Sequence, residues 1–401
     1  MANAPSVISM RFLHTSDWHI GKPLRNQKRD SEHVAALEEV LAIARDQRVD
    51  ALLIAGDVFD SAVPPPEAER IFFHFIGELV GAGIPAVIIA GNHDHPRRMN
   101  AYAPVLRHLG VRVVGEPVLA EEGGVIELPS LDGNETAVIA TLPWVSERKV
   151  RDFESLMTEG KHLEEYADGV AAMLNHLCKS FRPDAINIAM AHVFVAGAKV
   201  PQESGERPLH TGLLYTIAPA RLPTAPQYIA LGHVHMPQDV GLSNAQYCGS
   251  LLQCDFGEAG QQKRVNLVDA APGRKAKVEA VPLKSIRQLR NVGSAKQGVS
   301  LDEIRALAAD VSDAYLKVFV KVDRPVPGLA EQVRELLPNA VDIVIERPEV
   351  AATEDSASWQ KMTAPELFDA YYRQETGGNE PRPELAALFR QLHEEVTSAA
   401  D

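Results

Sequence analysis

The chain repeats one pattern five times: a mostly apolar run of a few residues ends in a glycine or another small residue, and metal-binding side chains follow. Runs of this kind predict buried strands, because a strand covered on both faces is apolar throughout. The runs are residues 10–15, 51–55, 86–90, 186–191 and 228–231. The metal-binding side chains that follow them are Asp17, His19, Asp57, Asn92, His192, His233 and His235, and His93 stands apart from these as a candidate acid. Open α/β sheets carry their sites at the carboxyl ends of strands, so we expect these side chains to meet.

The stretches between the first three runs predict helices. Apolar residues recur at helical spacing in residues 31–47 and again in residues 67–80. Three prolines at positions 64–66 precede the second stretch, and proline is tolerated in the first turn of a helix. Residues 10–90 therefore alternate strand, helix, strand, helix and strand, which predicts a layered α/β domain.

The spacing and type of the polar side chains indicate a metal site. Asp17 and His19 are two residues apart, as are His233 and His235. In an extended segment such pairs point to the same side, so each can present two ligands to one pocket. Imidazole suits Mn, Fe, Zn or Ni, whereas carboxylate and amide oxygens favour harder ions. This mixed set predicts Mn²⁺, with Mg²⁺, which prefers oxygens and water, as the alternative.

The number of these side chains favours two metal ions. Two divalent cations about 3.5–4 Å apart can clamp a phosphate and activate water for an in-line displacement. A shared carboxylate suits such a pair because its charge offsets the repulsion between the cations. Asp57, in the sequence AGDVFD, stands midway in the series of motifs and is the predicted bridge. The sequence thus predicts a two-metal phosphoesterase site.

Each motif taken alone has a simpler interpretation. A lone Asp-x-His is common and usually carries no function. The GNHD sequence that contains Asn92 and His93 is compatible with an ordinary turn, since Gly and Asn tolerate left-handed geometry. His14, which lies on a predicted strand before the site, is interpreted as a core residue or a residue that supports the ligands, and not as a ligand. The functional interpretation depends on five matching motifs in one order, each after a predicted strand.

The motifs LHTSDWHIG, LLIAGDVFD, IIAGNHDHP, AHVFVAGA and YIALGHVH resemble those of calcineurin-like metallophosphoesterases. Within that superfamily they are most similar to the SbcD family of double-strand-break repair nucleases. Residues 248–258, 316–340 and 365–396 also resemble this family, so the resemblance extends over nearly the whole chain. It implies a β-sandwich flanked by helices, a small α+β capping domain and C-terminal helices. It also implies a Mn-dependent exonuclease and endonuclease that processes DNA ends and hairpins.

The resemblance implies a role for each matching residue. One metal would be held by Asp17, His19, Asp57 and His235. The second would be held by Asp57, Asn92, His192 and His233. His93 would face the scissile phosphate and donate a proton to the leaving 3′ oxygen, with Asp94 orienting its ring. Asp60 stands where archaeal relatives carry a histidine, so we assign it no catalytic role.

The length and composition favour more than one domain. The chain has 401 residues, of which 45% are hydrophobic and 23% charged, so it can bury a full core. The expected parts are a nuclease domain (1–282), a capping domain that positions DNA (283–350), a linker (351–362) and terminal helices (363–401). Cys178, Cys248 and Cys254 show no metal-binding spacing, and we expect no disulfide. Without a signal segment or a long apolar run, the chain is expected in the cytoplasm.

The net charge of −14 is unexpected for a protein that binds DNA, because neutralising phosphates usually requires a basic balance. Basic residues nevertheless cluster after two of the metal motifs. The candidate phosphate contacts are Lys22, Arg25, Lys28, Arg29, Arg97 and Arg98. Each of them alone can equally be a solvated loop charge. The weak total basicity also suggests that partner proteins supply much of the DNA affinity.

Two short amphipathic helices are predicted near the C-terminus, at residues 365–372 and 383–396. Helices this short are marginal alone and need a surface to cover. They can pack on their own core, or they can dock on the coiled-coil base of an SbcC-type SMC-like ATPase, as the resemblance implies. The chain lacks a GxxxxGK[ST] motif, so any ATP dependence must come from a partner. The family also implies a homodimer within a heterotetramer, formed through residues 102–109.

Two rival functions remain open at this point. Another phosphoesterase of the same superfamily, such as a protein phosphatase or a small phosphodiester hydrolase, would share the ligands. It would need neither a capping domain nor terminal helices. A non-catalytic scaffold for DNA ends is the second rival, but such a protein should have lost ligands, and none is missing here.

Overall fold

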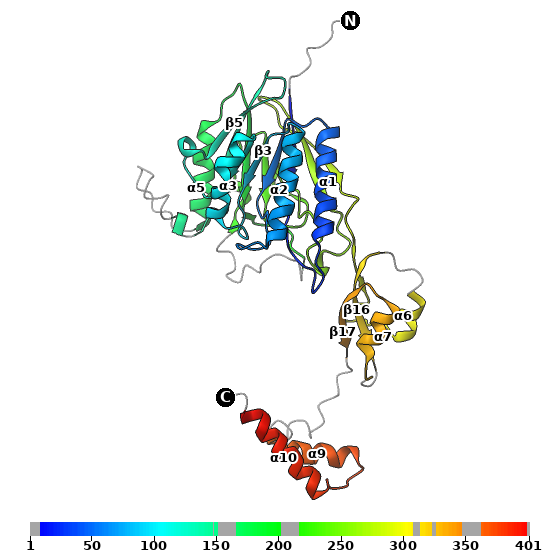
Figure 1. Cartoon of the computed structure of the whole chain (residues 1–401). Helices are drawn as coiled ribbons and strands as arrows, with labels where there is room; N and C mark the ends of the chain where they lie inside the picture. The colour runs from blue at the N-terminus through cyan, green and yellow to red at the C-terminus, as the bar shows by residue number, and fades with distance from the viewer. Residues whose placement is uncertain are drawn as a thin grey trace. The chain divides into compact units, whose positions relative to one another are not determined.

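The computed structural model describes residues 9–146, 148–150, 166–201, 216–307, 313–322, 326–346 and 362–398 (Figure 1). The chain divides into two compact units. One comprises Met1–Val320 with Gly328–Val344, and the other comprises Lys321–Pro327 with Ile345–Asp401. Apart from its last residue, the predicted linker at 351–362 lies outside the described residues.

The first unit contains two six-stranded sheets. In spatial order, one consists of β14 (Lys277–Pro282), β13 (Arg264–Ala270), β1 (Met10–Thr15), β2 (Ala51–Ala55), β3 (Ala86–Ile89) and β4 (Val111–Val114). The other consists of β11 (Gln238–Val240), β12 (Leu242–Tyr247), β10 (Tyr228–Gly232), β7 (Ile186–His192), β6 (Thr136–Leu142) and β5 (Val125–Pro129). Strands β1 to β4 pair in parallel, as do β6, β7 and β10.

The central strands are buried on both faces, which explains their apolar sequences. Along β2, Leu53 packs in a cluster formed only by residues from the two sheets and their flanking segments. Its neighbours Leu52 and Ile54 point to the opposite face and pack in a second cluster with helical residues. Because side chains alternate along a strand, one face of each sheet meets the other sheet and the second face meets helices. The predicted layered β-sandwich is confirmed.

Helices cover the outer faces of both sheets. Helices α1 (Asp30–Asp46), α2 (Pro66–Gly81) and α3 (Pro96–His108) lie over the first sheet (Figure 1). Helix α5 (Tyr166–Leu177) packs on the second sheet. The two helices predicted at 31–47 and 67–80 are confirmed within one residue at each end. Shorter elements are β8 (Phe194–Val195), β9 (Thr216–Ile217), and the 3₁₀ helices η1 (Ala120–Glu122), η2 (Cys178–Ser180) and η4 (Pro219–Arg221).

After β14 the chain forms a small three-stranded sheet with two helices. Its elements are β15 (Leu289–Val292), α6 (Leu301–Leu307), β16 (Tyr315–Lys321), α7 (Leu329–Leu336) and β17 (Ala340–Glu346). Leu289 and Tyr315 of this sheet pack with Leu24 and Phe256 of the larger domain. The small sheet is therefore attached to the loop that follows the first metal motif.

The second unit contains helices α9 (Ala364–Glu375) and α10 (Pro383–Ser398), which contain the two predicted terminal helices. They pack on each other, and the rings of Phe368 and Phe389 stack with centroids 4.3 Å apart. Their large exposed apolar side chains are Leu367, Tyr371, Leu388 and Leu392. No helix in the described part of the chain, these two included, is both long and apolar enough to cross a membrane.

Candidate metal centre

The predicted ligands lie just beyond the carboxyl ends of their strands, or on the last residue of one. Asp17 and His19 follow β1, Asp57 follows β2 and Asn92 follows β3, all from the first sheet. From the second sheet, His192 ends β7, whereas His233 and His235 follow β10. The two sheets thus contribute to one site because their parallel strands end on the same side.

The backbone turns sharply at several of these positions. Of the six non-glycine residues with positive φ in the described ranges, four are predicted ligands: Asp17, His19, Asp57 and His233. Positive φ is costly for residues other than glycine, and such strain concentrates at functional sites. Gly91 allows a close approach, because a Cβ there would overlap the Asp57 carboxylate. The glycines that precede Asp57 and Asn92 therefore serve packing around the site as well as the turns.

A first group of ligand atoms gathers around His19 and His235. Their Nε2 atoms lie 3.0 Å apart. His19 Nε2 is also 3.6 Å from Asp57 Oδ2. One ligand atom from each of Asp17, His19 and His235 lies within 4.8 Å of the others, and all three residues are buried. These are the residues expected to hold one metal together with Asp57.

A second group gathers around Asn92. Its Oδ1 is 3.1 Å from His192 Nε2 and 2.9 Å from His233 Nδ1. His192 Nε2 is 3.5 Å from Asp57 Oδ2, the same oxygen that faces His19. His192 Nδ1 donates to the carbonyl of Ala55, so its Nε2 is the atom free to bind a metal. Asp57 therefore stands between the two groups, where a bridge has to lie.

The donors fit a pair of divalent cations. Two nitrogens that each bind an ion at about 2.1 Å and at right angles lie about 3.0 Å apart. His19 and His235 show this spacing.

Burial alone would raise the pKa of Asp57, but His192 beside it holds that pKa well below its usual value. Asp57 is thus a buried carboxylate in its charged form, and cations would offset that charge.

His93 lies beside the two groups. Its backbone N–H donates to Asp57 Oδ1, and its Nδ1 is 2.7 Å from the carbonyl oxygen of Asp60. The His93 ring meets that of His19 edge to face, with centroids 4.7 Å apart. Because a carbonyl only accepts, His93 Nδ1 carries a hydrogen, and Nε2 is the nitrogen available to a substrate.

The role expected of Asp94 was wrong. Its carboxylate does not orient the His93 ring, because it accepts the backbone N–H groups of Val58, Phe59 and Gly91. Asp94 thus ties the loop after β2 to the loop after β3. The orienting contact on the His93 ring comes instead from the main chain of Asp60. Asp94 supports the site through the backbone and not through the proposed acid.

Several supporting residues were missed by the sequence reasoning. The carboxylate of Asp60 lies 3.4 Å from His19 Nδ1, and that of Glu258 lies 2.8 Å from His235 Nδ1. Trp144 stacks on His233 with ring centroids 5.2 Å apart. The segment with Glu258 belonged to the family resemblance, but no local pattern marks that glutamate as buried.

His14 is a core residue as predicted: burial lowers its pKa to about 3, and its Nδ1 contacts the Tyr228 hydroxyl.

Arg29 was wrongly included among the candidate phosphate contacts. Its side chain is 2% exposed, and it donates to the carbonyl of Gln253 and to the carboxylate of Glu32. Arg25 is more exposed, but it forms ion pairs with Asp255 and with Asp342 of the small sheet. Both arginines therefore connect parts of the protein to each other.

The other four basic candidates divide into two pairs. Lys22 forms an ion pair with Asp60, and Arg98 forms one with Glu69. Lys28 and Arg97 are exposed, and they form no ion pair within the described residues. These two are the side chains most available to a phosphate.

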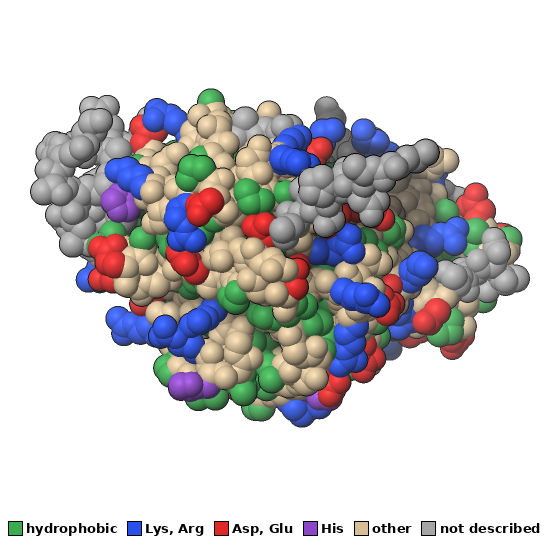
Figure 2. All heavy atoms as spheres, turned by 90° about the horizontal axis from the view of Figure 1, so that it is seen from above, with side chains coloured by type: hydrophobic (Ala, Val, Ile, Leu, Met, Phe, Trp, Pro, Cys, Tyr) green, Lys and Arg blue, Asp and Glu red, His purple; other side chains and the backbone are tan. Residues whose placement is uncertain are grey.

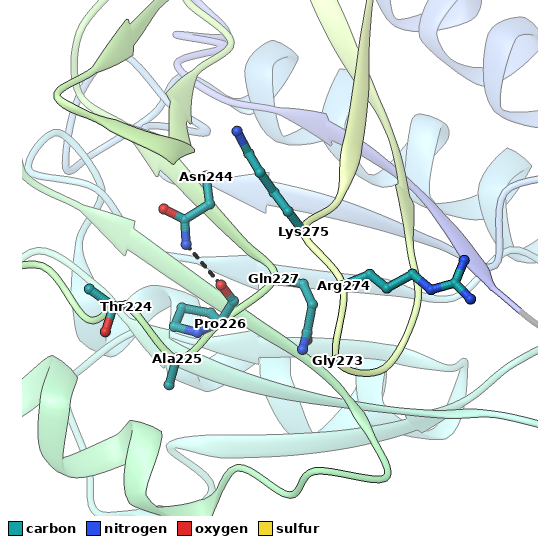
Figure 3. Close-up of a pocket in the computed structure, with 8 residues that line it drawn as sticks. All are labelled: Thr224, Ala225, Pro226, Gln227, Asn244, Gly273, Arg274 and Lys275. Atoms are coloured by element: carbon teal, nitrogen blue, oxygen red, sulfur yellow. Dashed lines mark hydrogen bonds between the residues drawn. The ribbon is translucent and has the colours of Figure 1, made fainter.

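A separate pocket of about 440 Å³ lies at the other end of β10 (Figure 3). It is lined by Thr224, Ala225, Pro226, Gln227, Asn244, Gly273, Arg274 and Lys275. Asn244 donates to the carbonyl of Pro226 across 2.8 Å. The pocket precedes the first residue of β10, whereas His233 follows the last one. None of the predicted site residues lines this pocket.

Comparisons with known proteins show the family to which this chain belongs. A family model for the calcineurin-like phosphoesterases matches residues 10–237, which include every predicted ligand. A protein of Bacillus subtilis (strain 168), named as the SbcD component of the SbcCD nuclease, is 34% identical over 390 residues, 96% of this chain and 97% of the relative. The chain belongs to the SbcD family of calcineurin-like phosphoesterases. The predicted family is thereby confirmed.

Other members of the SbcD family match over similar lengths. The Escherichia coli (strain K12) protein of the same name is 28% identical over 399 residues, 95% of this chain and 97% of the relative. The Rhodobacter capsulatus protein is 31% identical over 371 residues, 85% of this chain and 89% of the relative. A second family model, described as the type 5 capsule protein repressor C-terminal domain, matches residues 281–376. The phosphoesterase fold implies a pair of divalent cations.

Proposed function

We propose that this chain is a two-metal DNA nuclease that works with an SbcC-type ATPase in processing DNA ends and hairpins. The main observation in favour of this proposal is that Oδ2 of Asp57 faces both groups of ligands. It lies 3.6 Å from Nε2 of His19 and 3.5 Å from Nε2 of His192. One metal would be held by Asp17, His19, Asp57 and His235. The other would be held by Asp57, Asn92, His192 and His233.

Bound cations would clamp the phosphodiester and lower the pKa of a water that attacks it. His93 would donate a proton from Nε2 to the leaving 3′ oxygen, while the Asp60 carbonyl keeps Nδ1 protonated and the ring oriented. Asp94 would hold the loops that carry Asp57 and Asn92 in register. The mixture of imidazole, carboxylate and amide donors favours Mn²⁺ over Mg²⁺.

A direct assay separates the nuclease from its rivals. The purified full-length chain with Mn²⁺ would be given linear duplex DNA, hairpin DNA and a phosphopeptide. We expect cleavage of the two DNA substrates and no release of phosphate from the peptide. Hydrolysis of the phosphopeptide alone would favour a protein phosphatase. Absence of all hydrolysis with two bound Mn²⁺ ions would favour the scaffold.

Basic side chains beside the metal centre would provide the DNA contacts. The molecule as a whole is acidic, and in Figure 2 the Lys and Arg side chains are interspersed with Asp and Glu. Association with DNA phosphates therefore depends on a few local cations and on the bound metals. Lys28 and Arg97 fit this role because they are exposed.

We expect Lys28→Ala and Arg97→Ala each to weaken DNA binding about equally for all sequences. Each should lower the slope of log affinity against log salt concentration by about 1, since one phosphate contact is lost. The measurement is fluorescence anisotropy of labelled duplex over a salt series, in Ca²⁺ to prevent cleavage. Arg70→Ala is the matched control, because Arg70 is an exposed arginine that is paired with Glu67. An unchanged slope in both test variants would rule out these contacts.

The terminal helices would dock on the ATPase. Helix α9 has no fully buried residue, and Leu367, Tyr371, Leu388 and Leu392 are all more than a third exposed. An apolar row of this kind suits a helix-in-groove contact.

Homodimerisation through residues 102–109 would use Val105 and Leu109, which are 67% and 46% exposed. The small sheet around β16 would position DNA over the metals.

Deleting the residues after Ser358 should leave Mn²⁺-dependent nuclease activity but remove binding of the ATPase. The reason is that α9 and α10 belong to a compact unit distinct from the one with the metal centre. The measurement is co-purification with a tagged SbcC-type partner, with nuclease activity measured in parallel. Leu388→Asp in the full-length chain is the finer test of the same surface. Unchanged co-purification of the truncated chain would place the docking surface elsewhere.

A further inference from the structure

Glu258 forms a contact that the proposed chemistry does not use. It ends the 3₁₀ helix η5 (Phe256–Glu258), and its side chain is fully buried. Its Oε1 lies 2.8 Å from Nδ1 of His235. The other ring nitrogen of His235 is the one that faces His19. A carboxylate that accepts from one nitrogen of a histidine fixes the tautomer and the orientation in which the second nitrogen can bind a metal.

Lys263 holds this carboxylate in place. Its Nζ donates to Glu258 Oε2 across 2.7 Å and to the backbone carbonyl of His235 across 3.0 Å. The side chain of Lys263 is 1% exposed. The backbone N–H of Cys254 and the hydroxyl of Ser250 also donate to Glu258 Oε2. Oε1 of Glu258 thus contacts His235, whereas Oε2 accepts hydrogen bonds from Lys263, Cys254 and Ser250.

A buried ion pair of this kind usually adds little to the free energy of unfolding. Both charges lose their hydration, and well-packed apolar residues in the same space are often equally or more stabilising. The pair of Glu258 and Lys263 is in contact with His235 through both the ring and the main chain. Its position therefore points to a role at the ligand.

We propose that Glu258 is a positioning residue: clamped by Lys263, it orients His235 and strengthens metal binding in the pocket formed with His19. This inference rests on the two-metal site proposed above. Its effect should be confined to one of the two pockets. In the other, His192 donates Nδ1 to the Ala55 carbonyl, a backbone group that no side-chain substitution removes.

The test is a calorimetric titration of the full-length, metal-free chain with Mn²⁺ and no DNA. Glu258→Asp keeps the charge opposite Lys263 but shortens the side chain by one methylene. We expect it to weaken one of the two Mn²⁺ sites about 10–100-fold, as loss of an outer contact on a metal ligand does. The second site and the thermal midpoint of the metal-free chain should stay close to those of the wild type.

Background variants identify which site is affected. In His192→Ala, where only the pocket of His235 remains intact, adding Glu258→Asp should give the same 10–100-fold loss. In His235→Ala, adding it should change nothing. Glu39→Gln is the matched control, because Glu39 accepts the backbone N–H groups of Lys284 and Ser285, and it should leave both affinities unchanged.

Two results would overturn the role of Glu258. The first is that Glu258→Asp binds Mn²⁺ at both sites with wild-type affinity. The second is that adding Glu258→Asp to His235→Ala lowers the remaining Mn²⁺ affinity as much as it does in the wild-type chain. If Glu258→Asp fails to fold, Glu258→Leu/Lys263→Met carries the same expected loss of affinity, because it removes the acceptor on His235 and leaves no unpaired buried charge. A wild-type chain that binds no Mn²⁺ would instead refute the proposed two-metal function.

Discussion

His93→Ala is expected to abolish DNA hydrolysis while two metal ions remain bound. His93 is not one of the predicted ligands, although one of its ring nitrogens lies within 4.8 Å of ligand atoms of His19 and Asp57; its ring packs against His19, and its backbone N–H donates to Asp57. Alanine keeps that backbone donor and removes only the ring. Loss of a general acid typically lowers a rate about 10²–10⁴-fold. The measurement is the single-turnover rate of cleavage with Mn²⁺, together with the metal content of the same sample.

The metal content separates two explanations for a loss of activity. If bound Mn²⁺ falls together with the rate, His93 contributes to the metal site and the acid role is wrong. A substrate with a better leaving group provides a further check, since it needs less protonation. It should lose less activity in His93→Ala than DNA does. His95→Ala is a suitable control, because His95 is exposed at the start of α3.

Asp57→Asn is expected to weaken binding of both ions together and to remove hydrolysis. Asparagine preserves the shape, and its Oδ1 can still accept the backbone N–H of His93. The negative charge at the oxygen between His19 and His192 is lost. We expect each affinity to fall by at least about 10–100-fold, the loss seen for weaker outer contacts. Calorimetric titration with Mn²⁺ measures both sites.

Asp17→Asn provides the comparison for the shared role of Asp57. Asp17 is a predicted ligand of one metal only, the one held with His19 and His235; its carboxylate also lies near Asp57 and His192, and it accepts the backbone N–H of His233. Its substitution should weaken mainly one of the two sites. Two tightly bound Mn²⁺ ions in Asp57→Asn would contradict the bridge. A loss confined to a single site in that variant would assign Asp57 to one metal only.

The fold was largely predictable because its signals are local. Alternating faces in β2 and the apolar stripes of α1 and α2 arise from residues a few positions apart, and these signals survive whatever the chain packs against. The turns after the strands were equally readable, since Gly56 and Gly91 allow the close approach that the loops require. The convergence of the ligands then followed from the rule that parallel strands end at one edge of a sheet.

The contacts of long charged side chains were not predictable in this way. Arg25 and Arg29 follow a metal motif and resembled phosphate contacts, yet their partners Asp255 and Gln253 lie more than 220 residues away. Asp94 was assigned to the neighbouring ring, although its carboxylate is taken by backbone N–H groups of two loops. Such side chains have several rotamers, and the segments that pack around them select one.

The sequence by itself determined the five strands that precede the motifs, the helices α1 and α2 and the residue types that surround the site, because hydrophobic period and turn chemistry depend on near neighbours. Only the tertiary structure decided that Asp57 faces both groups of ligands and that Glu258 contacts His235. It also decided which basic residues remain exposed. These features depend on distances between segments far apart in the chain, and those distances exist only once the two sheets have packed together.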